Sequence, residues 1–487
     1  MFLYLTPPPL LARTAPGQSD PQAVASQALA AYGVDVPKTA IKLAEALSQP
    51  VTRGDLDTIV LEGIASGEPM AAVTLERVLT VLSQSMMLSY ASGESEDDDM
   101  LLRFAPVAPS LPLPARVPTS DMVFRLSRFA QIRVDETGRG PGQANPEGGL
   151  TMESPLARFR VHFARGGRGT TAMRAIALLG SGASLADFAR SRIPATEREA
   201  FFVLLAEAGF ILPVDDDGLT VEDRDPVKRQ WEVHDLAFHL RSRLGYHDQR
   251  IGGDFRFKGL LDPTEAVRPD PPHTARIPLP APDPAELAAT DPGLSTVIAA
   301  RSSKRPVARR ALTLPELGVF LWRTARIIAV HETDLGTFTA RPYPSGGGSY
   351  EQDVWITVRD VAGLQPGFYF YSAGSHELLL VTNWNSDCDT LIAQAAQAMA
   401  QATIPDCVLT LGARFQRMQW KYSGMAYATQ LKNAGAIYMA FYLAATAMGL
   451  SACGMGLGSL ALFHRLSGTD PLREGSIGEF ALSGPGG

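Results

Sequence analysis

Lys421 and Tyr422 are the two residues of this chain whose chemistry is most informative. They lie side by side in the stretch Trp420-Lys421-Tyr422-Ser423-Gly424. An amine in apolar surroundings loses its proton more readily than one in water, and a neighbouring phenol can share or relay that proton. The pair is therefore a candidate for proton transfer in which either side chain acts as general base. A solvated lysine beside a packed tyrosine is the alternative.

A second group of residues could bind an anion. Cationic and hydroxyl side chains gather just before a predicted helix over residues 314–322, at Arg301, Ser302, Ser303, Lys304 and Arg305. Such side chains bind phosphate through charge-assisted hydrogen bonds, and an arginine can supply two of them at once. A basic turn at the protein surface is the alternative.

A third group could accommodate a flat ligand. The stretch Pro344-Ser345-Gly346-Gly347-Gly348 contains three consecutive glycines. Glycine lacks the β-carbon that would keep a ligand away from the backbone amides. The stretch precedes an alternating sequence over residues 354–358, which predicts a strand. A flexible loop is the alternative.

The elements that must position these groups are strands and helices in mixed order. Further strands are predicted over residues 368–371, 378–381 and 407–411. A long apolar helix is predicted over 434–448, and a turn follows it that contains Gly454, Gly456, Leu457 and Gly458. The pattern lacks the G-x-G-x-x-G motif of a nicotinamide-binding fold. The sequence therefore predicts an α+β domain in this region.

The predicted helix belongs to a long stretch without formal charge. No charged side chain lies between Lys432 and His464, whereas a membrane helix needs about 20 apolar residues. Glycines interrupt the helical pattern, and no aromatic belt or basic flank accompanies it. We interpret the stretch as a buried helix followed by a glycine-rich turn, and we predict no membrane segment.

Two proline-rich spacers divide the chain, because proline fixes φ and removes a hydrogen-bond donor. They run over residues 106–118 and 269–284. The predicted parts are a module over 1–118, a second module over 119–225, a connector over 226–285 and a C-terminal domain over 286–487.

Both N-terminal modules are predicted to be winged-helix-like. The first has a helix with apolar residues at 75, 78, 79 and 82, followed by strands over 87–90 and 101–104 on either side of an acidic turn at 94–99. The second has strand-like runs over 124–134 and 156–163 and a helix over 172–179. A further helix is predicted to begin at Thr196, with Glu199 completing a capping box.

Charge argues against nucleic-acid binding. The 487-residue chain has a net charge of −7 and a pI near 5.7, which is unlike a protein with a broad basic surface. Residues 119–170 carry eight Arg or Lys and five Asp or Glu, a local balance of +3 that is weak for phosphate binding. An exposed strand edge could instead bind an extended peptide as an additional strand. Packing or dimerisation is the alternative role of these modules.

Cysteine and histidine positions predict no metal site. Cys388, Cys407 and Cys453 are an odd number at spacings that match neither a disulfide framework nor a zinc ligand set. His234 and His239 are five residues apart, so on a helix they point to different sides. The start of the sequence lacks the basic leader and cleavage site of a secretory signal. We therefore expect a cytoplasmic protein.

The order of these motifs resembles that of the SagB-type azoline dehydrogenases of the nitroreductase superfamily. The Pro-Ser-Gly-Gly sequence from Pro344 and the Lys-Tyr pair at Lys421 are the specific elements. The resemblance implies a C-terminal FMN-binding domain with a mixed sheet flanked by helices, and a homodimer. It also implies oxidation of thiazoline or oxazoline rings to thiazoles or oxazoles in ribosomally made peptides. Winged-helix peptide-binding elements often precede the catalytic domain in this family. The implied partners are an azoline-containing precursor peptide and a cyclodehydratase.

The resemblance also assigns residues. By position, Lys421 and Tyr422 match the catalytic pair. The implied cofactor-binding residues are Arg301, Ser302, Ser303 and Arg305 on the phosphate side, Pro344, Ser345, Gly346 and Gly347 along the isoalloxazine, and Gly456 and Leu457 in the later turn. The sequence departs from the family where Gly348-Ser349-Tyr350-Glu351 replaces a common Ala-Leu-His-Pro, and where Ser302 replaces a frequent second arginine.

The resulting hypothesis is that Lys421, helped by Tyr422, removes a proton from one ring carbon of a peptide azoline while the adjacent carbon delivers hydride to FMN at a dimer interface. Oxygen would then reoxidise the flavin. Two alternatives remain. One is an NAD(P)H-dependent nitroreductase or quinone reductase with the same fold. The other is a non-catalytic scaffold whose N-terminal modules bind a leader peptide.

Overall fold

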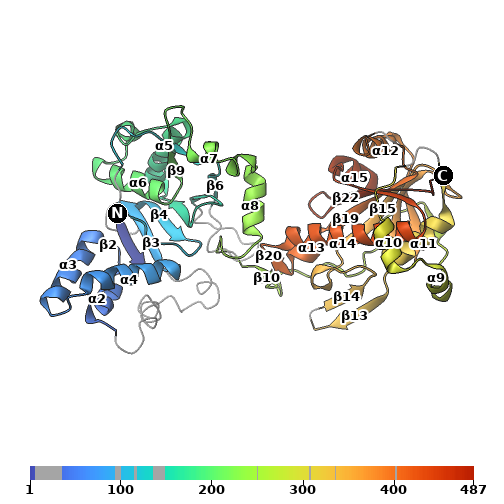
Figure 1. The fold of residues 1–487 in the computed structure, drawn as a ribbon, viewed down its shortest axis with the longest axis horizontal. Helices are drawn as coiled ribbons and strands as arrows, with labels where there is room; N and C mark the ends of the chain where they lie inside the picture. The colour runs from blue at the N-terminus through green and yellow to red at the C-terminus, as the bar shows by residue number, and fades with distance from the viewer. Residues whose placement is uncertain are drawn as a thin grey trace. The chain divides into compact units, whose positions relative to one another are not determined.

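The computed structural model describes residues 1–5, 36–93, 100–114, 118–134, 149–248, 250–305, 309–334, 336–400 and 403–486. The chain forms two compact units, Met1–Ile251 and Gly252–Gly487 (Figure 1). The predicted acidic turn at 94–99 and most of the stretch between the predicted strand runs of the second module lie outside the described residues.

One antiparallel sheet runs through the N-terminal unit. Its seven strands are, in spatial order, β2 (Val51–Thr52), β1 (Phe2–Leu5), β3 (Leu88–Gly93), β4 (Met100–Pro106), β8 (Phe159–Phe163), β7 (Leu150–Glu153) and β6 (Gln131–Val134). Strands β4 and β8 pair from Leu102 with Phe163 to Pro106 with Phe159. This pairing joins the two predicted modules into one sheet.

Five helices pack against this sheet around one hydrophobic core in the described part of the unit. They are α2 (Lys38–Ala46), α3 (Arg53–Ala65), α4 (Ala71–Gln84), α5 (Gly166–Ser181) and α6 (Ala195–Glu207). Helices α7 (Val221–Arg224) and α8 (Val233–Arg241) follow in the chain and contribute no residue to this core. A small second sheet pairs β5 (Phe124–Leu126) with β9 (Ile211–Pro213). The core takes Leu82 and Phe104 from before residue 118 and Phe201 from after it. The winged-helix prediction is therefore not confirmed, and the module boundaries stay a prediction.

Most local predictions for this unit agree with the structure. The helix with the apolar stripe is α4, and the strands on either side of the acidic turn are β3 and β4. The predicted capping box at Thr196 is wrong, because α6 begins one residue earlier and Pro194 occupies its N-cap position without a side-chain hydrogen bond. Thr196 already lies inside the helix, where its hydroxyl cannot cap the free amides.

A second antiparallel sheet forms the centre of the C-terminal unit. Its seven strands are, in spatial order, β11 (Ala275–Pro278), β18 (Glu377–Asn383), β17 (Gly367–Ser372), β15 (Gln352–Val358), β19 (Cys407–Arg414), β22 (Glu474–Ser483) and β21 (Ser451–Met455). Parallel pairing occurs between the short β12 (Leu312–Thr313) and β16 (Val361–Ala362). The predicted strands correspond to β15, β17, β18 and β19.

Helices cover both faces of this sheet (Figure 1). One face packs against α11 (Leu314–Thr324) and α14 (Ala426–Ala447), and the other against α12 (Ser386–Ala398) and α15 (Leu460–Ser467). The central strand shows the alternation that this layering requires, because Val354 and Ile356 face the first pair of helices while Trp355 faces the second. The predicted α+β domain, with its sheet flanked by helices, is confirmed.

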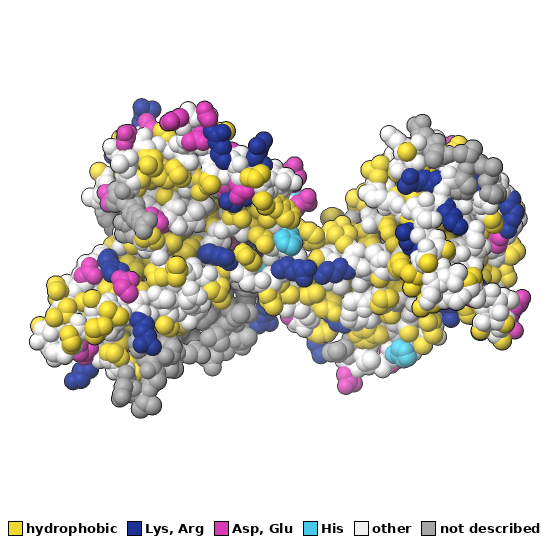
Figure 2. Space-filling model, viewed as in Figure 1, with side chains coloured by type: hydrophobic (Ala, Val, Ile, Leu, Met, Phe, Trp, Pro, Cys, Tyr) yellow, Lys and Arg dark blue, Asp and Glu magenta, His cyan; other side chains and the backbone are white. Residues whose placement is uncertain are grey.

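The uncharged stretch forms α14, β21 and part of α15. Helix α14 contributes Ile437 and Phe441, both fully buried, to the core beneath the sheet. Among the described residues, none of the helices combines the length and the apolar character that crossing a bilayer requires. On the face drawn in Figure 2, lysine and arginine side chains stand singly or in small groups among hydrophobic and uncharged ones.

Shorter elements complete the C-terminal unit. They are β10 (Gly252–Gly253), α9 (Pro284–Thr290), α10 (Leu294–Ala300), β13 (Ala329–Thr333), β14 (Gly336–Ala340), the 3-10 turn η4 (Gly346–Gly348), α13 (Phe415–Gln419) and β20 (Tyr422–Ser423). The two-residue strands β10 and β20 pair with each other, as do β13 and β14.

Candidate active site

The glycine loop is held by a buried polar network on α14. The Gly346 amide donates to Asn433 Oδ1 at 2.9 Å, and Asn433 Nδ2 donates to Ser345 Oγ at 3.0 Å and to Glu351 Oε1 at 3.0 Å. The Tyr350 amide donates to the same Ser345 hydroxyl. Asn433 is thus hydrogen-bonded to residues at both ends of the loop, so these bonds hold the loop against α14.

Glu351 is the charged member of this network. Its side chain is fully buried, and burial raises the pKa of its carboxyl while the hydrogen bonds from Asn433 and Ser345 oppose the shift. In the sequence, Glu351 stands out only as a departure from the family pattern, and no motif points to Asn433. The only sequence signal for Asn433 is a polar side chain in the middle of an apolar helix.

Lys421 and Tyr422 lie directly over the glycine loop. Lys421 Nζ donates to the carbonyl oxygen of Gly347 at 2.7 Å. A β-carbon at Gly347 would clash with the Tyr422 hydroxyl and would come within 2.7 Å of Lys421 Nζ, and its φ of +61° also favours glycine. A β-carbon at Gly346 would clash with Thr429 of α14. These two glycines therefore make room for the protein's own side chains.

Aromatic rings and a neighbouring positive charge lie close to the Lys421 amine. Its Nζ lies 4.9 Å from the ring centre of Phe338 and 5.9 Å from that of Phe255. Desolvation lowers the pKa of Lys421, and the charge of Arg417 lowers it further. Burial raises the pKa of Tyr422, so the phenol keeps its proton. Of the two predicted bases, the geometry and electrostatics favour Lys421.

Arg417 organises the wall beside Lys421. Its guanidinium donates to three backbone carbonyls, those of Ser349 at 2.5 Å, Thr264 at 2.8 Å and Thr337 at 3.1 Å. Burial, together with the charges of neighbouring arginines, lowers its pKa to about 10. Arg417 thereby joins three separate segments around a cavity of about 420 Å³ that includes Lys421 in its lining. A cavity of this volume is in the range of small-ligand sites.

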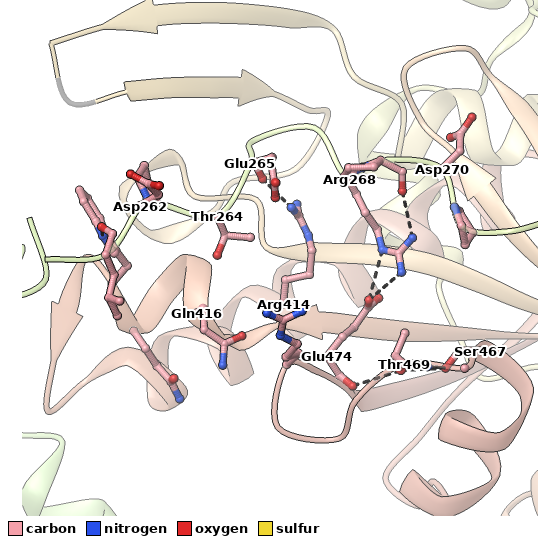
Figure 3. Close-up of a pocket in the computed structure, with 18 of the residues that line it drawn as sticks. Asp262, Thr264, Glu265, Arg268, Asp270, Arg414, Gln416, Ser467, Thr469 and Glu474 are labelled. Atoms are coloured by element: carbon pink, nitrogen blue, oxygen red, sulfur yellow. Dashed lines mark hydrogen bonds and ion pairs between the residues drawn. The ribbon is translucent and has the colours of Figure 1, made fainter. Parts of the chain in front are cut away.

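A larger cleft of about 770 Å³ adjoins this cavity. Figure 3 shows Thr264, Glu265 and Arg268 along one side of it and Gln416 and Thr469 along the other. In the cleft, Arg268 Nη2 donates to Glu474 at 2.9 Å, and Arg414 donates to the carbonyl oxygen of Glu265 (Figure 3). The cleft and the cavity share lining residues at Pro263, Thr264, Glu265 and Trp420. The cleft and the cavity are therefore neighbours with a common wall.

The predicted phosphate-side residues gather near the other half of α14. Ser303 Oγ lies 2.7 Å from the hydroxyl of Tyr442, and the Arg301 guanidinium lies 5.2 Å from the centre of the same ring. Arg305 Nε donates to Cys453 Sγ at 3.4 Å. The Tyr442 hydroxyl also accepts from the amide of Gly454. Tyr442 therefore links this cluster to the end of β21, a role that the sequence did not indicate.

The cations of this cluster remain uncompensated. Within the described residues, no carboxylate lies within ion-pair distance of Arg301, Lys304 or Arg305. Ser302, Ser303, Lys304 and Arg305 are exposed, and the structure gives no hydrogen-bond partner for the Ser302 side chain in the described part of the chain. Three cations, of which Lys304 and Arg305 are exposed and Arg301 is half-buried, with adjacent hydroxyls and no carboxylate suit a phosphate group.

Gly456 and Leu457 form an exposed turn after β21. The Leu457 side chain is 57% exposed, and a β-carbon at Gly456 would meet nothing within 4 Å. The adjacent Gly458 packs against the carboxyl of Glu479, and burial raises the pKa of Glu479 to about 7. This turn leaves room for a ligand but contributes no contact to either cluster in the described structure.

The described residues contain no group of three or more His, Cys, Asp or Glu side chains arranged to hold a metal ion. Cys388, Cys407 and Cys453 are buried and free. Burial raises the pKa of Cys388 and Cys407, so these thiols are poor nucleophiles. The groups that can do chemistry are therefore those around Lys421 and the anion-binding cluster.

The residues of the cationic cluster fit the phosphate of a flavin mononucleotide. Arg301, Ser303 and Arg305 would hold that phosphate. Asn433 and Tyr442 lie nine residues apart on α14, about 14 Å along the helix and on opposite sides of it. The positions that a β-carbon would take at Gly346 and Gly347 already face Thr429, Tyr422 and Lys421, so the role of the loop along a flat ring stays a prediction.

Comparison with known proteins finds two family models in separate parts of the chain. Residues 298–480 match the model of the nitroreductase family, and residues 124–248 match the model of the cyanobactin oxidase ThcOx. The first match coincides with most of the C-terminal unit. The second lies in the N-terminal unit and ends shortly after α8.

Individual proteins are similar to part of this chain. A putative nitroreductase of Methanocaldococcus jannaschii, MJ1384, is 27% identical over 163 residues, covering 34% of this chain and 78% of the relative. A solved putative nitroreductase of Ralstonia eutropha is 21% identical, with a TM-score of 0.34 over 46% of this chain and 98% of that one. The Escherichia coli microcin synthetase McbBCD complex with truncated pro-MccB17 contains a chain that is 19% identical, with a TM-score of 0.32 over 37% of this chain and 68% of that one. With TM-scores this low, the two structural matches carry no functional conclusion.

The two family models cover different motifs and elements. The nitroreductase match covers the anion-binding cluster, the glycine loop and Lys421, and the ThcOx match covers strands β5 to β9 and helices α5 to α8. The C-terminal part of the chain thus has the nitroreductase fold, and a separate segment of the N-terminal unit is similar to a cyanobactin oxidase.

Proposed function

We propose that this protein is an FMN-dependent dehydrogenase that oxidises thiazoline or oxazoline rings in a ribosomally made peptide to thiazoles or oxazoles. The observation that carries the proposal is the position of Lys421, whose amine is anchored on the Gly347 carbonyl and lines a cavity of about 420 Å³. The match of one segment to a cyanobactin oxidase and of another to nitroreductases supports it.

The residues around Lys421 suit proton removal from a bound ring. Lys421 must be neutral to accept a proton, and desolvation together with Arg417 lowers its pKa in the required direction. The azoline loses two hydrogens, one as a proton to Lys421 Nζ and one as hydride from the adjacent ring carbon. Bound FMN would supply the two-electron acceptor for that hydride. The proton then leaves Lys421 for solvent through the open side of the cavity.

Tyr422 serves this reaction differently from Lys421. Because burial raises its pKa, it remains a phenol and acts as a hydrogen-bond donor near Gly347. No hydrogen bond joins Lys421 and Tyr422 within the described contacts, so a direct proton relay between them would need a bridging water or substrate atom. We assign Lys421 as the base and Tyr422 as a residue that orients the ligand.

The partners follow from this chemistry. The substrate is a precursor peptide in which a cyclodehydratase has already formed azoline rings, because those rings are the reduced form of the product. A homodimer is proposed from the family resemblance, with FMN bound where two copies meet. Oxygen is proposed as the final electron acceptor and the cytoplasm as the compartment.

The proposal is tested with purified protein and one azoline peptide. We expect a yellow protein with a flavin absorption spectrum and, in the presence of oxygen, a peptide product that is lighter by two hydrogens in mass spectrometry. A colourless protein that does not bind added FMN would contradict the proposal. A colourless protein that still binds the peptide would instead support the scaffold alternative.

A nicotinamide-driven reductase is the second candidate, because the nitroreductase match covers the cationic cluster, the glycine loop and Lys421 and one relative is a putative nitroreductase. The two candidates differ in what reduces the flavin. Under anaerobic conditions, NAD(P)H without peptide would bleach the flavin of a nitroreductase. An azoline peptide without NAD(P)H would bleach the flavin of an azoline dehydrogenase.

A further inference from the structure

Part of the Lys421 cavity is built by a segment that neither family model covers. The ThcOx match ends at residue 248 and the nitroreductase match begins at residue 298. Between them, residues Gly252–Thr264, here named the strap, run alongside the catalytic segment of the C-terminal unit. The strap and the residues just after it supply Phe255, Pro263, Thr264, Glu265, Ala266 and Val267 to the lining of the cavity.

The strap contacts each residue from Trp420 to Ser423. Gly252 and Gly253 pair as β10 with Ser423 and Tyr422. The Trp420 indole donates to the carbonyl oxygen of Leu261 at 2.8 Å.

Side chains and backbone reinforce this pairing at Lys421 itself. The amide of Phe255 donates to the carbonyl oxygen of Lys421 at 3.3 Å, and Ser423 Oγ donates to Asp254 Oδ2 at 2.7 Å. The Phe255 ring packs edge-on against Trp420, with 5.7 Å between ring centres. The backbone of Lys421 is therefore fixed from the strap, while its side chain is fixed at its far end by Gly347.

We propose that the strap positions Lys421 and shields its amine from water, with Phe255 as the positioning residue that does so. The amine lies 5.9 Å from the ring centre of Phe255 and 4.9 Å from that of Phe338, and these two residues line the same cavity as Lys421. Removing one of these rings would admit water to one side of the amine. This inference deepens the proposed function, since it rests on Lys421 being the base there.

The direction of the effect follows from solvation. An ammonium is stabilised by water, so admitting water favours the protonated amine and raises its pKa. The ring of Phe255 also attracts a cation, but that attraction is weak at 5.9 Å. Desolvation therefore dominates, and loss of Phe255 is expected to raise the pKa of Lys421.

Other titratable groups surround the same amine and must be kept constant. Arg417 on α13 carries a charge close to it, and the centre of the Tyr422 ring on β20 lies 5.4 Å from Nζ. Glu265 lines the same cavity, and Asp254 on the strap accepts a hydrogen bond from Ser423. Of these, Arg417 contributes to the pKa of Lys421 through its charge. None of the four is changed by substitution of Phe255, so the shift reports on the ring alone.

The experiment measures the pKa of Lys421 directly in the full-length flavin-loaded protein. The chain has seven lysines, so reductive methylation with ¹³C-formaldehyde gives few methyl signals in an NMR titration, and Lys421→Arg identifies the one from Lys421. Phe255→Ala is expected to raise the pKa of that signal by about one unit. Phe255→Leu, which keeps an apolar side chain there, is expected to restore most of the original value.

Phe257→Ala is the matched control, because Phe257 is a strap phenylalanine that lines the larger cleft and not the Lys421 cavity. It should leave the pKa of Lys421 unchanged. Ser423→Ala removes the anchor to Asp254 without touching a ring and should give a smaller shift in the same direction. An unchanged Lys421 pKa in folded Phe255→Ala protein, or an equal shift in Phe257→Ala, would overturn the proposal.

The titration also separates this inference from the proposed function. A raised pKa in Phe255→Ala supports the positioning role whatever the substrate is. If Lys421→Ala nevertheless oxidised azolines at the full rate, the strap would still shield Lys421, and only the assignment of that lysine as the base would fail.

Discussion

The glycine-loop end and the cationic end of the candidate site are built in opposite ways. At the glycine loop, Asn433 and Glu351 are buried and hydrogen-bonded, and the backbone positions are fixed by the protein's own side chains. At the cationic end, Arg301, Ser303 and Arg305 are largely exposed and have no carboxylate partner within the described residues. The first end is complete without a ligand, and the second is complete only with an anion.

This difference indicates how the two ends should respond to mutation. Changes at the glycine-loop end should alter catalysis and stability, because they disturb a prebuilt structure. Changes at the cationic end should alter affinity for the cofactor and leave stability nearly untouched.

The largest effect is expected for Lys421→Ala. Losing a positioned base typically costs about a hundred- to ten-thousand-fold in rate, while the bound flavin should remain because the cationic end is intact. The measurement is azole formation by mass spectrometry alongside the flavin absorption spectrum. Lys432→Ala, which removes an exposed lysine from α14, is the control and should retain full activity. Full turnover by Lys421→Ala would remove its assigned role.

Asn433→Leu should destabilise the glycine-loop end. It leaves the Gly346 amide and the buried Glu351 carboxyl without their asparagine partner, at a cost of about 2–4 kcal/mol in the free energy of unfolding. Chemical denaturation measures this loss, with Lys432→Leu as a neighbouring exposed substitution. Equal stability of the two variants would mean that the network does not hold the loop.

The double substitution Arg301→Ala with Arg305→Ala should weaken FMN binding by about ten- to a thousand-fold, because each charged hydrogen bond contributes about 1.5–3 kcal/mol at most and exposure reduces that. The unfolding free energy of the flavin-free protein should not change. Fluorescence titration with FMN gives the affinity. Arg276→Ala removes a cation that already pairs with Asp270 and Glu377, and its FMN affinity should equal that of the unsubstituted protein.

A smaller, pH-dependent effect is expected at Glu479, the buried carboxyl behind the turn of Gly456 and Leu457. Burial raises its pKa from 4.5 to about 7 in the folded protein. Between these values the folded protein binds a proton that the unfolded chain has lost, so stability falls as the pH rises through this window. Glu479→Gln should flatten that fall, by about 2.5 kcal/mol at most between pH 5 and pH 8. Thermal unfolding at both pH values measures it, and an unchanged slope would place this carboxyl in contact with water.

The smallest effect is expected for Ser302→Ala at the cationic end. Ser302 is exposed and has no hydrogen-bond partner for its side chain in the described structure, so FMN affinity and stability should change by less than about twofold and 0.5 kcal/mol. The same titration used for the arginines measures it. A tenfold loss would show that Ser302 contacts the phosphate, and Ser303→Ala is the matched comparison.

Sequence patterns predicted the C-terminal core well, because its strands and its long helix are rich in apolar residues. The runs that became β15, β17 and β18 are short, largely apolar stretches, and the helix predicted over 434–448 corresponds to the C-terminal part of α14 to within one residue. Residue types singled out Lys421, the glycine loop and the arginine cluster as candidates, the family resemblance suggested their roles, and those roles stay predictions. These features are local, so a local pattern can report them.

The parts that were missed depend on contacts between distant residues. Asn433 meets Gly346 across 87 positions, and Arg417 meets Thr264 across 153; neither residue has a distinctive local pattern. The strap falls in the predicted connector over 226–285. Its structure depends on pairing with β20, which no local sequence pattern indicates. The predicted capping box at Thr196 failed because a preceding proline set the start of the helix.

The pairing of β4 with β8 has a practical consequence for anyone who divides this protein. A fragment that stops near residue 118 would expose one side of β4, an interior strand whose residues Leu102 and Phe104 are fully buried in the intact chain. Unprotected strand edges recruit other chains, so such a fragment should precipitate or form oligomers. Expression of residues 1–251 as one piece keeps that edge covered.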